Sequence, residues 1–214
     1  MARPRKKSNL AAARARMYHD LVFECAERVF AEEGVAKSAM QDLAAEAGIS
    51  LKTLYATFAG KDDIYRAILA ERGAGLVAAV QQAAHQEGTA FERLAAGIRG
   101  LVAYFVEHEA FFRILLQEGH AWGLDPKGGS ARGSWETGLT TVRDVIAEGV
   151  ASGEFLPADP DLLAPTVNAV LQVQLAGLLA RSDEPDTEAI SREILRSMRR
   201  LLCGSDAEPR SHAA

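Results

Sequence analysis

The chain of 214 residues carries a formal net charge of −5, and 48% of its residues are hydrophobic and 25% charged. Such a chain can bury a core, which excludes intrinsic disorder for most of its length. Its two cysteines exclude a disulfide scaffold and a four-thiolate metal site. Aromatic residues make up 7%, and no proline lies between Pro4 and Pro126, so the composition predicts an all-α fold.

The first sixteen residues are strongly basic. They contain six Lys and Arg residues and no acid, a local charge of +6 that leaves −11 on the remainder when it is subtracted from the total of −5. We expect a disordered arm over 1–16, which either contacts a polyanion or is a solvated tail. The apolar run over 10–13 is too short for a secretory signal. The expected location is therefore cytoplasmic.

Two helices are predicted directly after this arm. Apolar residues recur at three-to-four spacing over 18–33, which predicts a helix that ends at Gly34. A second helix is predicted to begin at Ser38, because Ser38-x-x-Gln41 has the pattern of a capping box. Gly48 ends it.

The rest of the chain is predicted to consist of further helices. A short third helix begins at Ser50, and a fourth helix, acidic in its first turn, runs from Lys61 to about residue 85. A glycine-rich loop over 123–133 and a turn over 153–160 interrupt the remainder. The other predicted helices cover 91–108, 110–120, 135–152, 162–181 and 187–202.

The uncharged stretch over 162–180 needs a check as a membrane span. Its length approaches the roughly 20 residues that a spanning helix requires. It contains Asn168, Gln172 and Gln174, however, all of which a single-pass helix would expose to lipid. A helix buried between protein surfaces fits better, and we expect no membrane partner.

The second and third helices form a predicted helix-turn-helix motif. Two short helices joined by a turn of three to four residues that contains Gly48 match its description. Ala44 and Ala47 are small enough for a close approach of the two helices, Ile49 fills the angle between them, and Ser50 can cap the third helix. The outer face of the third helix is what a DNA major groove would meet.

The sequence of this motif is specific. It reads L-A-A-E-A-G-I-S over 43–50 and T-L-Y-A-T-F-A-G-K over 53–61. Over the first third of the chain it resembles the tetracycline-repressor-like (TetR/AcrR) family of bacterial transcriptional regulators, whose pattern is I/L-A-x-x-A-G-V-S followed by T-L-Y-x-H/Y-F-x-x-K. Two positions depart from the pattern. Lys52 stands where the family often has glycine, and Thr57 stands where it has His or Tyr.

The resemblance implies a set of DNA-contacting residues. Lys52 and Thr53 would approach base edges or the DNA backbone, and Tyr55 and Lys61 would bind phosphates. Tyr55 as core packing, and Lys61 as an ordinary solvated lysine, are the alternatives; Leu51 would either touch a thymine methyl or cover the scaffold. The predicted DNA-binding residues are Ser38, Ser50, Leu51, Lys52, Thr53, Tyr55, Thr57 and Lys61.

The resemblance also implies a larger helical domain that binds a small-molecule effector. Large apolar residues concentrate in the middle of this domain and would line a cavity for a hydrophobic or aromatic ligand; a packed core is the alternative. The predicted ligand-binding residues are Phe105, His108, Phe111, Phe112, Leu115, His120, Trp122 and Trp135.

The last two predicted helices suit dimerisation. The helix over 162–181 is apolar on both sides, and the helix over 187–202 has one apolar stripe, so their pairing across a two-fold axis would make a four-helix interface. The predicted interface residues are Val167, Val170, Leu171, Leu175, Leu178, Ile194 and Met198.

No catalytic or metal-binding pattern emerges. The five histidines lack metal-ligand spacing, and the glycines near Lys127 do not form a phosphate-binding loop. We therefore expect no cofactor, no metal and no enzymatic activity. An enzyme or ligand carrier, and an architectural scaffold, are the alternatives to the leading hypothesis, which is a homodimeric repressor that leaves its double-stranded operator DNA when a small effector binds.

The predicted organisation divides the chain into four segments. A basic arm over 1–16 precedes a helix-turn-helix DNA-binding domain over 17–65. A helical ligand-binding and dimerisation domain follows over 66–203. A disordered tail over 204–214 ends the chain.

Overall fold

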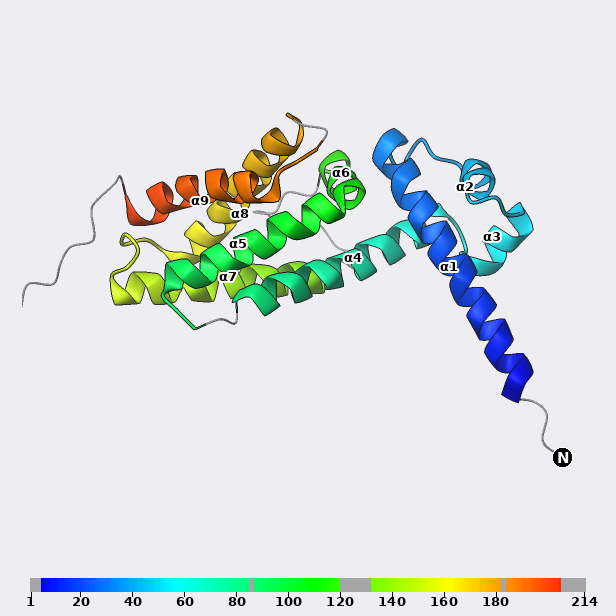
Figure 1. Ribbon diagram of the computed structural model, residues 1–214, viewed down its shortest axis with the longest axis horizontal. Helices are drawn as coiled ribbons and strands as arrows, with labels where there is room; N and C mark the ends of the chain where they lie inside the picture. The colour runs from blue at the N-terminus through cyan, green and yellow to red at the C-terminus, as the bar shows by residue number, and fades with distance from the viewer. Residues whose placement is uncertain (1–4, 85–86, 120–131, 182–183, 205–214) are drawn as a thin grey trace, which may run out of the picture. The chain divides into compact units, whose positions relative to one another are not determined.

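The computed structural model describes residues 5–84, 87–119, 132–181 and 184–204; side chains are described from residue 12 onwards and, in the helix that begins at Arg132, from residue 138 onwards (Figure 1). Within these ranges the chain forms nine helices and no strand, which confirms the all-α prediction. The helices are α1 (Arg5–Glu33), α2 (Met40–Glu46), α3 (Leu51–Thr57), α4 (Lys61–Ala84), α5 (Ala90–Glu107), α6 (Glu109–Gln117), α7 (Arg132–Ser152), α8 (Pro160–Leu179) and α9 (Thr187–Cys203).

The helices group into two compact units. The N-terminal unit comprises Met1–Arg72 with Glu109–His120, and the C-terminal unit comprises Gly73–His108 with Ala121–Ala214. Helix α4 contributes its first half to one unit and its second half to the other. Helix α6 belongs to the N-terminal unit because it packs against α1, a long-range pairing that the sequence-based division at residues 65 and 66 did not foresee.

The basic arm is helical where the structure describes it. Helix α1 begins at Arg5, so the prediction of disorder over 1–16 is wrong from that residue onwards, and residues 1–4 lie outside the described part. Alanine, arginine and lysine have high helix propensities. One turn apart, the Arg14 guanidinium donates a hydrogen bond to the Tyr18 hydroxyl at 3.2 Å and lies 5.5 Å from the ring centre.

The core of the N-terminal unit is built from α1, α2, α3, α6 and the first half of α4. Its fully buried side chains include Phe30, Leu43, Leu54, Ile64, Ile68, Phe111 and Phe112. Helix α6 is also held by a polar contact, because the Gln117 amide donates a hydrogen bond to the Ala31 carbonyl at 2.7 Å.

An ion pair with little solvent exposure joins α1 to α4 inside this unit. The Glu27 side chain is only 7% exposed, and its carboxylate accepts hydrogen bonds from Arg72 Nε at 3.0 Å and Nη2 at 2.8 Å. The Arg72 guanidinium also lies 5.2 Å from the centre of the Phe23 ring. Bidentate geometry of this kind makes a strong and directional charge-assisted contact.

The C-terminal unit packs α5, α7, α8 and α9 with the second half of α4. Helix α8 contacts both α7 and α9, and α5 contacts α7 and α9. By length and composition α8 could cross a membrane. It nevertheless buries Val167, Leu171 and Leu175 within the unit, as expected for the core helix of a globular protein.

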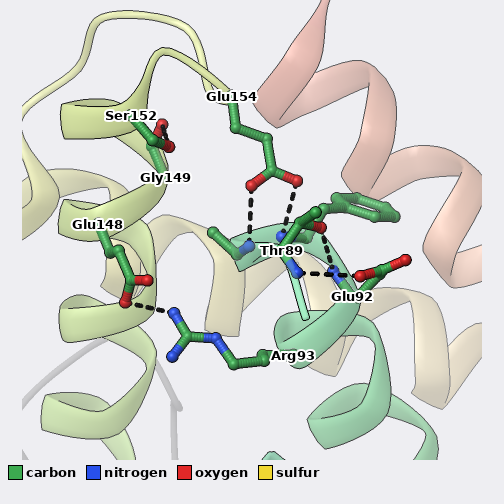
Figure 2. Close-up of polar contacts among 9 residues, drawn as sticks. Thr89, Glu92, Arg93, Glu148, Gly149, Ser152 and Glu154 are labelled. Atoms are coloured by element: carbon green, nitrogen blue, oxygen red, sulfur yellow. Dashed lines mark hydrogen bonds and ion pairs between the residues drawn. The ribbon is translucent and has the colours of Figure 1, made fainter. Parts of the chain in front are cut away.

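A carboxylate from the turn after α7 caps the start of α5 (Figure 2). Glu154 accepts hydrogen bonds from the backbone amides of Ala90 at 2.8 Å and Phe91 at 3.1 Å. Thr89 and Glu92 form a capping box at the same helix end. These contacts satisfy amides that a helix N-terminus leaves unpaired, and they fix the turn against α5.

Candidate functional site

The turn between α2 and α3 has the geometry of a helix-turn-helix. Gly48 adopts a φ of +63°, a left-handed conformation that side chains disfavour, and its amide donates to the Ala45 carbonyl at 3.1 Å. Ile49 then donates its amide to the Ala44 carbonyl at 3.0 Å. Ala44 and Ala47 are buried beneath this turn, which confirms the prediction that small residues allow the helices to approach.

Ser50 caps α3 as predicted. Its hydroxyl accepts a hydrogen bond from the Thr53 amide at 3.1 Å and lies 2.8 Å from the Thr53 hydroxyl. On the inner side of the helix, Leu54 is fully buried and Phe58 is 4% exposed. The cap and these two apolar anchors orient α3 and determine which of its residues face outward.

The outer face of α3 presents Lys52, Tyr55 and Ala56. Tyr55 is 51% exposed, and the other two residues are also exposed. Leu51, Thr53 and Thr57 are half-buried, and the Thr57 hydroxyl donates to the Thr53 carbonyl at 3.0 Å. Sequence reasoning missed Ala56, although its position four residues after Lys52 places it on the same helical face.

Ser38 does not form the predicted capping box. It is only 3% exposed and donates its hydroxyl to the Gly34 carbonyl at 2.8 Å, while Ala39 occupies the N-cap of α2 without a side-chain bond. The physical reason is competition: the end of α1 leaves carbonyls unpaired, and the Ser38 hydroxyl satisfies one of them. This hydroxyl is therefore not presented to a phosphate.

Lys61 contacts the same loop. Its ammonium donates hydrogen bonds to the carbonyls of Ala36 at 2.9 Å and Ser38 at 3.2 Å. The side chain thus ties the start of α4 to the α1–α2 loop. The Lys61 ammonium is therefore already bonded within the protein, and Lys61 is not an ordinary solvated lysine.

The residues predicted to bind a ligand are divided between the two units. Phe105 and the half-buried His108 belong to the C-terminal unit, whereas Phe111, Phe112 and Leu115 lie on α6 and are buried in the N-terminal unit. His120, Trp122 and the side chain of Trp135 lie outside the described residues. Their shared role in a ligand site stays a prediction.

A cavity of about 40 Å³ lies inside the C-terminal unit, at a different set of residues. Side chains from α4, α5, α7 and α8 line it, and most are apolar. The apolar residues that line it include Val80, Leu94, Ile98, Val145, Val167 and Leu171. The polar residues that line it are Arg93, Thr141 and Asn168.

Arg93 is the unusual member of this lining. Its side chain is 23% exposed, and Nη2 forms an ion pair with Glu148 of α7 (Figure 2). Its Nε atom is buried and has no hydrogen-bond partner among the described residues. A buried donor without a partner costs about 1–3 kcal/mol, so such atoms are rare and call for an explanation.

Most of the predicted dimer-interface residues are buried inside the single chain. Val167, Leu171, Leu175, Ile194 and Met198 are at most 3% exposed, and Val170 and Leu178 are half-buried. These side chains hold the C-terminal unit together, so they offer a partner little or no area. Sequence periodicity identified two apolar sides of α8. The side that carries these residues is buried inside the chain.

The other side of α8 remains exposed. Its row of outward residues comprises Leu162, Thr166, Ala169, Val173 and Gly177. Leu162 is 70% and Val173 72% exposed, and the Thr166 hydroxyl donates to the Leu162 carbonyl at 2.8 Å. This surface, which we name the α8 outer row, is apolar and largely made of small residues.

Neither a metal site nor any clustering of metal-ligating side chains is found in the part of the chain that the structure describes. The described features that stand out are the exposed face of α3 in the N-terminal unit, and the cavity and the α8 outer row in the C-terminal unit.

Known proteins share this arrangement. The family model of bacterial regulatory proteins, tetR family, matches residues 22–68. The HTH-type transcriptional repressor SCO4008 of Streptomyces coelicolor is 25% identical over 187 residues, which cover 85% of this chain and 93% of the relative.

Solved structures show the same fold. A tetR-family regulatory protein from Rhodococcus RHA1 has a TM-score of 0.75 at 20% identity and covers 88% of this chain and 98% of its own. AibR, solved in complex with isovaleryl coenzyme A and operator DNA, has a TM-score of 0.70 at 16% identity and covers 87% of this chain and 98% of its own.

The matching family model and the relative SCO4008 both describe bacterial transcriptional regulators. The match of the family model to 22–68 spans α2, the turn, α3 and the start of α4, the elements whose geometry is described above. The chain therefore resembles tetR-family bacterial regulatory proteins in sequence over 22–68 and in fold over most of its length.

Proposed function

We propose that this regulator is a homodimeric repressor that binds operator DNA through α3 and releases it when a small apolar effector binds the C-terminal unit. One observation carries the DNA-binding half of this proposal. Helix α3 is anchored by Leu54 on one side and presents Lys52 and Tyr55 on the other, so its cationic and hydrogen-bonding groups are free to enter a major groove.

The proposed DNA contacts divide into two kinds. Lys52 lies in the first turn of α3, where recognition helices meet base edges, and it contacts either a base or a phosphate. The exposed Tyr55 hydroxyl donates to a phosphate, a contact that positions the protein without reading sequence. The arginines of the helical N-terminal arm add affinity that depends on salt concentration.

The homodimer is proposed to form through the α8 outer row. Its residues expose apolar area without an unpaired side-chain donor, since the Thr166 hydroxyl is bonded within the helix. Small residues such as Ala169 and Gly177 permit a second helix to approach closely. A two-fold axis through this row would give the dimer two copies of α3, and operators of dimeric regulators have half-sites that repeat at about one helical turn or its multiples.

Helix α4 is the proposed mechanical link between effector and DNA. Ile64 and Ile68 are buried in the N-terminal unit, whereas Val80 and Ala84 line the cavity of the C-terminal unit. An effector that prefers one position of α4 would change the spacing of the two recognition helices, with a coupling of about 1–3 kcal/mol. The solved AibR complex, with isovaleryl coenzyme A and operator DNA, supports an effector that carries an apolar group.

The test is a titration of DNA by protein with and without small molecules. DNA that flanks the gene of this protein is used in a gel shift or an anisotropy assay, and candidate effectors are then added. If an effector lowers the affinity for operator DNA by some factor, linkage requires that operator DNA lower the affinity for the effector by the same factor. Equal effector affinities in the presence and absence of operator would contradict the proposed coupling.

A further inference from the structure

We propose that the cavity in the C-terminal unit accepts an uncharged molecule with an apolar body and one carbonyl oxygen, which accepts a hydrogen bond from Arg93 Nε. The proposal rests on the ligand response proposed above and names the chemical class of the effector. It also moves the site away from the aromatic residues of α6, because the cavity is lined by α4, α5, α7 and α8.

Arg93 brings an unpaired hydrogen-bond donor to the cavity. Arg93 lines the cavity, and its Nε atom is buried without a hydrogen-bond partner among the described residues. Arginine cannot lose its proton in a protein, so this N–H always requires an acceptor. A ligand that brings an acceptor oxygen gains a bond which the free protein lacks.

The charge of Arg93 is already paired. The Arg93 guanidinium already forms an ion pair with Glu148, whose side chain is 60% exposed (Figure 2). The guanidinium is thus paired through Nη2, while the buried Nε–H has no partner among the described residues. A carboxylate ligand would lose its hydration to reach a cation that is already paired, and an amine would meet a donor instead of an acceptor. A neutral carbonyl avoids both penalties.

The size and lining of the cavity limit the ligand further. The cavity has a volume of about 40 Å³, which suits a short hydrocarbon group and a carbonyl rather than a large ring system. Gly97 of α5 lines it, and a Cβ atom built there would lie 3.6 Å from Val80 and 3.8 Å from Ala84. These are ordinary contact distances, so Gly97→Ala fills cavity space without straining its neighbours.

The experiment compares four probes of equal chain length on the full-length protein: methyl propyl ketone, pentanoate, pentylamine and pentane. Binding is measured by calorimetry and ligand-observed NMR, and the carbonyl stretching band of the bound ketone is recorded by infrared spectroscopy. We expect the ketone to bind at least about tenfold more tightly than the other three, the contribution of one hydrogen bond to a charged donor. Its carbonyl band should lie at a lower frequency than that of the ketone dissolved in a hydrocarbon.

Three variants sharpen the result. Gly97→Ala should weaken ketone binding by about tenfold or more and leave operator binding unchanged. Gly138→Ala, at a helical glycine of α7 with open space around its Cβ position, is the matched control and should bind the ketone as the wild type does. Arg93→Lys keeps a cation for Glu148 but removes the Nε–H, so it should abolish the infrared shift and the preference for ketone over pentane.

Several outcomes would overturn the proposal. These are equal affinities for ketone and pentane, tighter binding of pentanoate, no binding of any probe, or unchanged ketone binding in Gly97→Ala. Operator binding is measured in parallel, so each of these results leaves the DNA-binding function standing. Ketone binding that responds to Gly97→Ala and Arg93→Lys but does not release operator would support this site and contradict the ligand response proposed above.

Discussion

The two units of this protein use their polar side chains differently. In the N-terminal unit, the side chains of Ser50 and Thr57 bond to backbone groups of α3, and those of Ser38 and Lys61 bond to backbone groups of the loop between α1 and α2. In the C-terminal unit, the core is apolar, and among the described residues its buried side-chain atoms without partners are Arg93 Nε and Gln174 Oε1.

The difference fits the roles proposed for the two units. A surface that reads DNA must hold its side chains in one geometry, and side-chain bonds to the backbone restrict the loop and the helix ends that carry them. A unit that receives a ligand gains from a cavity and an unsatisfied donor, although both lower its stability in the free state.

The two sides of α8 should respond to the same substitution in different ways. Leu171→Glu places a carboxylate at a position that is 3% exposed, so we expect it to lower the free energy of unfolding by more than about 4 kcal/mol or to prevent folding. Val173→Glu lies on the α8 outer row, 72% exposed. It should leave the protomer folded and dissociate the dimer. Circular dichroism and sedimentation velocity separate these results, and a dimer that survives Val173→Glu would place the interface elsewhere.

The ion pair between Glu27 and Arg72 should stabilise the N-terminal unit strongly. Arg72→Ala leaves the Glu27 carboxylate, 7% exposed, without its partner, and we expect a loss of about 3–5 kcal/mol in the free energy of unfolding. Arg192→Ala is the control, because the Arg192–Glu188 pair is exposed on both sides and should contribute less than about 1 kcal/mol. Urea denaturation measures both, and equal losses would contradict the assignment.

Lys61→Met distinguishes a structural lysine from a phosphate contact. The substitution removes two hydrogen bonds to the carbonyls of Ala36 and Ser38. We expect the free energy of unfolding to fall by about 1–3 kcal/mol. The dependence of operator affinity on salt should keep its slope. A slope reduced by about one unit at unchanged stability would instead show that Lys61 binds DNA directly.

The outer face of α3 should affect DNA binding without affecting stability. Tyr55→Phe should weaken binding to all DNA sequences by about 1–2 kcal/mol, the contribution of a hydrogen bond to a charged group. Lys52→Ala should either relax the preference at one base position or reduce the salt slope by about one unit. Both variants should unfold at the wild-type urea concentration. Unchanged operator affinity in both would show that α3 does not contact DNA as proposed.

Sequence reasoning succeeded where structure depends on nearby residues. Gly48 and Ser50 determine the turn and the cap of α3 through their own backbone and side-chain geometry, and both were predicted. The helix bounds also agree closely, as for α9, predicted over 187–202 and observed as Thr187–Cys203. Periodicity and helix end signals suffice for such elements.

Sequence reasoning failed mainly where residues far apart in the chain determine the structure. Ser38 is a local exception, because its hydroxyl donates to the Gly34 carbonyl four residues earlier instead of capping α2. Periodicity identified both apolar sides of α8 but could not tell which one packs against α7 and α9. The cavity escaped prediction because its lining comes from four helices, and the residues that stood out in the sequence were large aromatics rather than Gly97 or Arg93.

In α3, the residues that hold the helix in place differ from those that face the solvent. Leu54 and the Ser50 cap hold the helix in place, while Lys52, Tyr55 and Ala56 face solvent and bury nothing in the core. The three outward positions can therefore be exchanged by evolution or by engineering at little cost to folding. If α3 contacts the operator as proposed, a library that varies only these positions and retains Gly48, Ser50 and Leu54 should change the preferred DNA sequence and leave the proposed effector response of the C-terminal unit intact.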